Sequence, residues 1–340
     1  MSADIQSSDG PAFRLGTAIH GGARTVVVES RGSLYDLAEL VPAAPPASSV
    51  LDLIESGWDA VLDGIAEVLA GGPAARPLDE GSLRWQAPVM HPRKLICIGT
   101  NYKDHIREMG FSLEALSAHP YSFLAPPTTT LVGTGQQVAV PAIAERIDWE
   151  AEVALVIGHP ARNVKAADAP GYVAGFAVLN DLSARDWSGP NAPAVGIDWV
   201  MTKAHDGFKP MAPFVTPARF IPAPEKLWVR SWVNGRLKQD GSTSDMLFDF
   251  WQIIEHLSRI LTLEPGDVIA TGTPAGVGHG RRPPEYLTAG DHVAVEVESL
   301  GRVETTLIGQ DGAPSASLAG TPSLTGTASL TGTAVPDGRS

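Results

Sequence analysis

The sequence lacks the features that mark several classes of protein. It holds one cysteine, Cys97, which excludes an intramolecular disulfide and fits a buried small hydrophobic residue better than a nucleophile. No window of roughly 18 residues is apolar and uncharged, so we expect no membrane-spanning segment. Residues 1–10 are polar and lack the apolar part of a signal peptide. We therefore expect a cytoplasmic protein with no membrane partner.

Positive charge is also scarce. The chain has 25 Lys and Arg against 38 Asp and Glu, a formal net charge of −13. This balance argues against unaided binding to nucleic acid or to an anionic membrane surface. By contrast, 44% of the 340 residues are hydrophobic, enough for a sizeable core. The length fits two domains, or one large domain with an appendage.

The first part of the chain reads as a flexible N-terminus, residues 1–10, and a small N-terminal α/β domain, residues 11–90. Apolar stretches separated by glycines predict short strands over residues 13–19, 25–29 and 33–36. Helical spacing of apolar residues predicts a helix that starts near Val50 and ends at Gly71. No motif here carries obvious chemistry, which favours a spacer or dimerisation role.

An acidic strand stands out in the following segment, residues 91–310. Residues 148–157 end in an apolar, β-branched run, which predicts a strand that enters a core. Because side chains alternate along a strand, Asp148, Glu150 and Glu152 would point to the same side. Such carboxylates repel one another, and a hard divalent cation is the simplest group to hold them together. A solvated acidic strand end fits this stretch about equally well.

Two other features add chemistry. His105 and Glu108 are three residues apart in a short predicted helix, where a carboxylate can fix the tautomer of the imidazole and raise its basicity. On an exposed helix such a pair is usually a solvated ion pair. Asp181 follows a predicted strand that runs from residue 172 to residue 180. A lone aspartate there is usually a turn former, but beside two glutamates it becomes a third oxygen ligand.

Together these pieces resemble the fumarylacetoacetate hydrolase family, including its bacterial single-chain members, over about residues 94–303. The resemblance rests on five ordered motifs: Gly99-Thr100-Asn101-Tyr102 with His105 and Glu108; Glu150-x-Glu152; Asn180-Asp181-x-Ser183-Ala184-Arg185-Asp186; Lys203-x-x-Asp206-x-Phe208-x-Pro210; and Thr271-Gly272-Thr273-Pro274-x-Gly276-Val277-Gly278. It implies an α+β fold with a mixed β-roll or β-barrel catalytic domain over residues 91–310, and a homodimer.

The resemblance also implies a set of functional residues. Mg²⁺ or Mn²⁺ would be held by Glu150, Glu152 and Asp181. The other implied residues convert or bind the substrate: His105, Glu108 and Lys203 as catalytic residues, with Arg185 and Thr273 as substrate-binding residues.

The chemistry that the resemblance implies begins with a small-molecule oxo acid. The divalent cation stabilises an enolate, and a water activated by His105 attacks the distal ketone. We therefore expect a metal-dependent hydrolase that cleaves a C–C bond of a β-diketo acid similar to an acylpyruvate or fumarylpyruvate. The alternatives are a decarboxylase or an isomerase/tautomerase of 2-oxo acids such as oxaloacetate, and a non-catalytic ligand-binding member.

Four positions depart from the family pattern. Ala125 follows Phe-Leu where a lysine is usual, and Ser188 stands where a glutamine is common. His205 replaces an aromatic or small residue, and Ala212 replaces a glycine. The metal-binding and acid–base residues are retained, so we infer the same chemistry on an uncommon substrate. Sequence drift in a housekeeping enzyme is the alternative.

The last segment, residues 311–340, repeats a six-residue pattern that starts at Ser317, Ser323 and Ser329. Hexapeptide repeats can stack into a β-helix, but three short copies have too little apolar area to offset the entropy of ordering. We expect a disordered low-complexity tail that is not needed for the chemistry.

Overall fold

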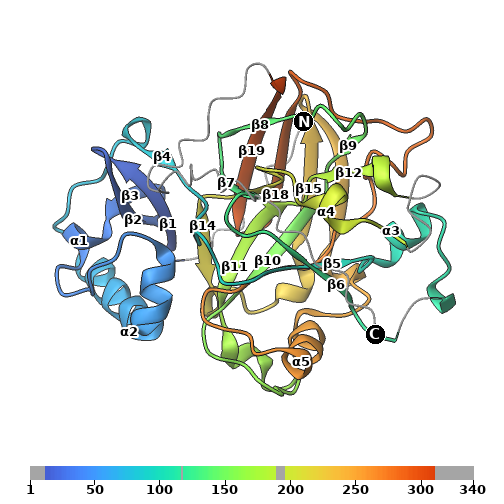
Figure 1. Ribbon diagram of the computed structural model, residues 1–340. Helices are drawn as coiled ribbons and strands as arrows, with labels where there is room; N and C mark the ends of the chain where they lie inside the picture. The colour runs from blue at the N-terminus through green and yellow to red at the C-terminus, as the bar shows by residue number, and fades with distance from the viewer. Residues whose placement is uncertain (1–11, 116–117, 189–195, 311–340) are drawn as a thin grey trace, which may run out of the picture.

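The computed structural model describes residues 12–115, 118–188 and 196–310. Its fold is α+β, as predicted, with one large sheet, a second sheet of five strands and a two-stranded pair (Figure 1). The sheets are open, so of the two expected forms the β-roll describes the catalytic domain and a closed barrel does not. Both ends of the large sheet are edge strands that do not pair with each other. The predicted N-terminal segment 1–10 and tail 311–340 lie outside the described residues.

The large sheet joins strands from most of the chain. Its main path runs β3-β2-β1-β14-β11-β10-β17-β5-β6, with β4 on β1 and β13 between β11 and β7. Its twelve strands are β1 (Arg14–His20), β2 (Ala23–Ser30), β3 (Ser33–Asp36), β4 (Arg84–Trp85), β5 (Leu95–Gly99), β6 (Tyr121–Ala125), β7 (Leu131–Gly133), β10 (Ala151–Ile157), β11 (Val173–Asn180), β13 (Lys209–Met211), β14 (Phe214–Pro217) and β17 (Val268–Ala270). Most neighbours are antiparallel, and β5 runs parallel to β17.

The five-stranded sheet packs against one face of the large sheet. Its order is β16-β15-β18-β19-β8. The strands of this sheet and of the two-stranded pair are β8 (Gln137–Ala139), β15 (Trp228–Val233), β16 (Arg236–Ser242), β18 (His292–Val297), β19 (Gly301–Ile308), β9 (Ile147–Asp148) and β12 (Ser183–Ala184). Val153 and Leu155 of β10 share a buried cluster with Val293 and Val295 of β18, so the main core lies between the two sheets.

The central strands β10 and β11 are buried on both faces. The opposite face of β10 carries Ala154 and Val156, which pack in a second cluster that includes Cys97. Burial on both faces explains why these strands read as continuous apolar runs rather than as an alternating pattern. Burial also raises the pKa of the Cys97 thiol well above its ordinary value, so Cys97 fits the predicted small hydrophobic residue.

The N-terminal elements are found where the sequence predicts them. Helix α2 (Val50–Gly71) begins with a capping box formed by Ser49 and Asp52, and its backbone is kinked at Gly57. The indole of Trp58 in α2 donates a hydrogen bond to the backbone oxygen of Ala174 in β11. Strand β1 pairs with β14, so the first strands extend the large sheet. The domain boundary near residue 90 stays a prediction.

The remaining helices are short. They are α1 (Leu37–Leu40), α3 (Lys103–Glu108), α4 (Trp199–Lys203) and α5 (Phe250–Ile260), with 3₁₀ turns at Glu80–Ser82, Leu113–Ala115, Ala169–Tyr172, Arg185–Trp187, Ala218–Phe220, Pro224–Lys226 and Thr243–Asp245. Helix α3 lies at the opposite side of the molecule from α2 (Figure 1). Within the described parts of the chain, no helix has the length and apolarity needed to cross a membrane.

Candidate active site

A buried acidic cluster lies where β10 and β11 meet. Glu152 belongs to β10, Glu150 precedes that strand, and Asp181 follows β11. The two strands are antiparallel, with Ala151 opposite Asn180, and this register brings the start of one beside the end of the other. One carboxylate oxygen from each acid lies within 4.8 Å of the others. The predicted convergence of the three carboxylates is therefore confirmed.

The acidic strand is not continuous, which corrects one detail of the sequence analysis. Residues 149–150 separate β9 from β10, so strict alternation does not carry through. The Asp148 carboxylate does not join the cluster. It accepts hydrogen bonds from the backbone N–H groups of Gly278 (2.6 Å) and His279 (3.1 Å), and from Arg185 Nε at 2.9 Å. Asp148 therefore anchors the glycine-rich turn and the arginine.

In the described part of the chain, three cations contact these carboxylates. Lys203 Nζ lies 2.6 Å from Glu150 Oε2 and 3.0 Å from Asp181 Oδ2. Arg185 Nη2 lies 2.5 Å from Glu150 Oε1. The third cation, Lys209 of β13, was not predicted from the sequence, and its Nζ lies 2.6 Å from Asp181 Oδ1. A lysine inside the apolar strand segment 208–215 was the available signal, because a charged residue there needs a buried partner.

The two glutamates respond differently to this setting. Burial disfavours the charged form of Glu150, but Lys203 and Arg185, with a further contribution from His105, lower the pKa of Glu150 to about 2. Burial and the nearby Asp181 and Glu150 raise the pKa of Glu152 well above its ordinary value. One oxygen of Glu152 accepts a hydrogen bond from Gly272 N at 2.8 Å. Glu152 is therefore the acid whose charge the protein compensates least.

The charge balance and the donor atoms fit a divalent cation. The buried charged groups of the site are four carboxylates and three cations: Asp148, Glu150, Glu152, Asp181, Arg185, Lys203 and Lys209. With all four carboxylates ionised, as metal binding requires, one negative charge is left over, and the raised pKa of Glu152 is consistent with this missing counter-charge. Within the described chain, Asp181 Oδ1 is contacted by the Lys209 ammonium in a geometry outside the usual hydrogen-bond angles, and by no other donor. Unsaturated, buried carboxylate oxygens are the ligands that Mg²⁺ and Mn²⁺ prefer.

His105 and Glu108 form the predicted pair on α3. Their contact joins His105 Nδ1 to Glu108 Oε2 at 3.2 Å, and the imidazole is buried. Both carboxylate oxygens of Glu108 accept the backbone N–H of Gly276, at 2.9 and 3.1 Å. The glycine-rich turn therefore holds Glu108, and Glu108 holds the imidazole. Nε2 is left as the ring nitrogen that can exchange a proton with a substrate.

The substrate-binding role of Arg185 and Thr273 stays a prediction, and the structure shows which protein groups they contact. Arg185 engages Asp148 and Glu150. The Thr273 hydroxyl donates its hydrogen to the backbone oxygen of Ala151 at 2.9 Å and accepts a hydrogen bond from Gln239 Nε2 at 2.7 Å. A hydroxyl has one hydrogen to donate, so Thr273 cannot donate to a substrate anion while this bond is made. Both residues brace the wall of the acidic cluster.

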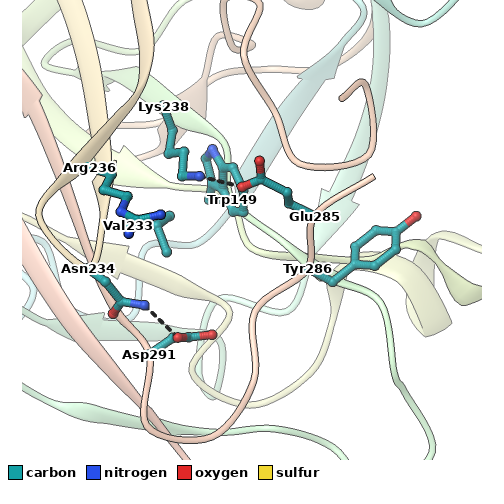
Figure 2. Close-up of a pocket in the computed structure, with 8 residues that line it drawn as sticks. All are labelled: Trp149, Val233, Asn234, Arg236, Lys238, Glu285, Tyr286 and Asp291. Carbon is teal, nitrogen blue, oxygen red and sulfur yellow. Dashed lines mark hydrogen bonds and ion pairs between the residues drawn. The ribbon is translucent and has the colours of Figure 1, made fainter. Parts of the chain in front are cut away.

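A separate open cavity of about 510 Å³ lies beyond Trp149, between β16 and the loop that carries Glu285 (Figure 2). It is lined by Trp149, Val233, Asn234, Arg236, Lys238, Glu285, Tyr286 and Asp291. Two of the charged residues that line the cavity, Lys238 and Glu285, form an ion pair with each other. None of the three cluster acids lines it, so it is not the site of the predicted chemistry. The Trp149 indole donates a hydrogen bond to the backbone oxygen of Gly276 at 3.2 Å, and this bond connects the wall of the cavity to the glycine-rich turn.

Comparisons with known proteins agree with these features. The family model described as fumarylacetoacetate (FAA) hydrolase C-terminal matches residues 94–308. The chain is 33% identical to the oxaloacetate tautomerase fahd2, mitochondrial, of Xenopus laevis, over 89% of each sequence. It also resembles two solved structures. One is a fumarylacetoacetate hydrolase from psychrophilic Exiguobacterium antarcticum, with 33% identity, a TM-score of 0.74, and 88% of this chain and 100% of that chain covered.

The other solved structure is the maleylpyruvate hydrolase from Sphingobium sp. SYK-6 in complex with manganese(II) ion and pyruvate. The identity is 28% and the TM-score 0.69, with 87% of this chain and 100% of that chain covered. The family model matches more than half of the chain, and the Xenopus laevis relative is aligned with this chain over most of both sequences. The chain therefore belongs to the fumarylacetoacetate hydrolase family.

Proposed function

We propose that this protein is a divalent-metal-dependent tautomerase of a 2-oxo dicarboxylic acid such as oxaloacetate. The observation that carries the proposal is the contact of buried His105 with half-buried Glu108, together with the electrostatic effect of His105 on Glu150 in the cluster of Glu150, Glu152 and Asp181. The similarity to an oxaloacetate tautomerase over 89% of the chain supports the same reaction class. This reaction was an alternative in the sequence analysis, and the relatives move it ahead of C–C hydrolysis.

The acidic cluster supplies the binding chemistry. Glu150, Glu152 and Asp181 would hold Mg²⁺ or Mn²⁺, which when bound draws electron density from the oxo and carboxylate oxygens of the substrate. Lys203 stays beside Glu150 and Asp181, where its ammonium attracts an anionic substrate. Burial disfavours the charged form of Lys203, but Asp181 and Glu150 outweigh this effect and raise its pKa. Lys203 therefore remains a cation and does not serve as the base.

His105 moves the proton. With Nδ1 held by Glu108, Nε2 takes a proton from the carbon next to the oxo group, and in the reverse direction it returns that proton. Glu108 fixes the orientation of the ring through its contact with Nδ1. The clamp of Gly276 on Glu108 keeps the imidazole in place without help from the substrate. Positioned proton transfer of this kind contributes roughly 10²–10⁴-fold to a rate.

Hydrolysis of a C–C bond in a β-diketo acid is the second candidate. The same His105 nitrogen can remove a proton from a water molecule that attacks the distal ketone. The similarity to a maleylpyruvate hydrolase structure favours this candidate. Decarboxylation has weaker support, because loss of CO₂ needs no base for water and leaves the His105–Glu108 pair without a proton to move.

One set of assays separates these reactions. Purified protein with Mn²⁺, Mg²⁺ or EDTA is given oxaloacetate, and keto–enol conversion is followed by ultraviolet absorbance, while CO₂ release and acylpyruvate cleavage are measured in parallel. We expect fast, metal-dependent keto–enol conversion that Glu150→Ala abolishes together with metal binding. Acylpyruvate cleavage without accelerated keto–enol conversion would favour the hydrolase. Inactivity of metal-loaded protein on all the substrates would support a non-catalytic role.

The assembly and the compartment also remain proposals. We propose a homodimer that uses edge strand β6 and helix α4, where Tyr121, Leu124 and Val200 expose large apolar side chains. Light scattering would give the mass of the particle in solution, and a monomer at micromolar concentration would refute the dimer. The cytoplasmic location stays a prediction. The Xenopus laevis relative is named as mitochondrial, so microscopy of a tagged full-length chain is the direct test.

A further inference from the structure

Among the residues that the structure describes, Lys209 is the one buried cation at the acidic cluster that neither the motifs nor the proposed reaction uses. It occupies a position that the lysine motif leaves open, between Phe208 and Pro210. Its side chain is completely buried. A buried ammonium is costly unless its hydrogens and its charge are satisfied. The surroundings of Lys209 therefore show what its charge acts on.

The ammonium is held on one side by the backbone. Nζ donates to the backbone oxygen of Lys203 at 2.7 Å and to that of Phe208 at 3.3 Å. Its contact with Asp181 Oδ1, at 2.6 Å, is an ion pair whose geometry lies outside the usual hydrogen-bond angles. The carbonyls thus fix the charge in place, while Asp181 keeps a lone pair for another partner. Lys209 is built to act on the cluster through its charge.

We propose that Lys209 sets the charge of the metal site, weakening divalent-cation binding in exchange for attraction of a doubly charged substrate. With Lys209, the seven buried charged groups leave one net negative charge, and a divalent ion makes the loaded site positive by one. Without Lys209, the loaded site is neutral. The inference on substrate charge rests on the proposed function, whereas the inference on metal affinity does not.

Two consequences follow from Coulomb's law. A cation within a few ångströms of a ligand oxygen repels the bound metal, so removing it should tighten metal binding on the order of 10- to 100-fold. The loaded site then attracts anions less, and a dianion loses about twice the interaction energy that a monoanion loses. A positioning role without an effect of charge predicts the opposite for the metal, because a loosened Asp181 would bind it more weakly.

The test uses Lys209→Met, which keeps the length of the side chain, and Lys209→Gln as a second neutral variant. Both are purified with Mn²⁺ present, so that metal binding supports folding if the metal-free form is unstable. Mn²⁺ affinity is then measured without substrate by competition with a chelator. The matched control is Lys94→Met, which removes a partly buried lysine paired with Glu264 and Asp267 away from the cluster.

We expect both Lys209 variants to bind Mn²⁺ at least tenfold more tightly than the wild type, with Lys94→Met unchanged. Unchanged or weaker Mn²⁺ binding in the folded Lys209 variants would overturn the inference on the metal. In kinetic assays we expect KM for oxaloacetate to rise several-fold, with a smaller rise for a monoanionic 2-oxo acid. Equal rises for both would overturn the inference on substrate charge. Because Mn²⁺ affinity is measured without turnover, that measurement can still be interpreted if the proposed reaction is not observed.

Discussion

Substitution of Gly280 tests whether the clamp on Glu108 matters for the chemistry. A Cβ added at Gly280 would lie 2.3 Å from Glu108 Cγ and 2.4 Å from Cδ. Contacts under 3.0 Å are not tolerated, so in Gly280→Ala the Glu108 side chain must move by roughly 1 Å. It then loses the bonds from Gly276 N and its contact with His105 Nδ1.

The expected cost follows from these contacts. A hydrogen bond to a charged group contributes about 1.5–3 kcal/mol, so Gly280→Ala should lower the free energy of unfolding by about that much. A misplacement of about 1 Å in a catalytic group costs about 10²-fold in rate, so kcat should fall about 10- to 100-fold. Mn²⁺ affinity should hold, because Glu108 is not among the cluster acids.

A double-mutant cycle makes the test specific. In a Glu108→Ala background, Gly280→Ala should lower kcat and the free energy of unfolding little further, because the side chain that it displaces is already absent. Gly171→Ala is the matched control, since a Cβ at Gly171 meets no atom within 4 Å. Oxaloacetate keto–enol conversion gives kcat, and urea unfolding gives stability. A wild-type kcat in Gly280→Ala, or full additivity with Glu108→Ala, would refute the reasoning.

Three further predictions concern other parts of the chain. His105→Ala should lower kcat by roughly 10²–10⁴-fold with Mn²⁺ affinity preserved, and near-normal turnover would remove His105 as the base. Deletion of residues 315–340 should leave kcat and Tm nearly unchanged because the repeats have little apolar area; a large loss of either would contradict this. Burial lowers the pKa of half-buried His205. Below about pH 6.5 the unfolded state therefore binds a proton that the folded state does not, so the free energy of unfolding should decrease as the pH is lowered. Urea unfolding between about pH 7 and pH 5 should show a shallower fall in His205→Gln, and an equal fall would exclude His205 as a source.

Much of the local structure could be predicted from the sequence because it depends on neighbours along the chain. The apolar run of β10, the strand that ends before Asp181 and the helix that begins after Ser49 follow from periodicity and capping. The pairing of His105 with Glu108 also follows from local spacing, since residues three apart share a helical face. In each case the interacting groups lie within a few residues of each other.

Features that depend on contacts between distant segments could not be predicted in this way. The break at residues 149–150 follows from the pairing of Asp148 with Ser183, which local alternation does not contain. The sheets stay open because β3 and β6 end as edges, a property of the whole topology. The hydroxyl of Thr273 donates a hydrogen bond to the backbone oxygen of Ala151, more than a hundred residues earlier in the chain.

The sequence by itself determined the residue types of the site, because three carboxylates and a histidine–glutamate pair can be recognised along the chain without knowledge of the fold. Only the tertiary structure decided how the charges are distributed. The antiparallel register of β10 and β11 brings Glu150, Glu152 and Asp181 together, and β13 delivers Lys209 to the same cluster. Buried charges interact strongly over a few ångströms, so their balance depends on distances that the packing of remote strands sets.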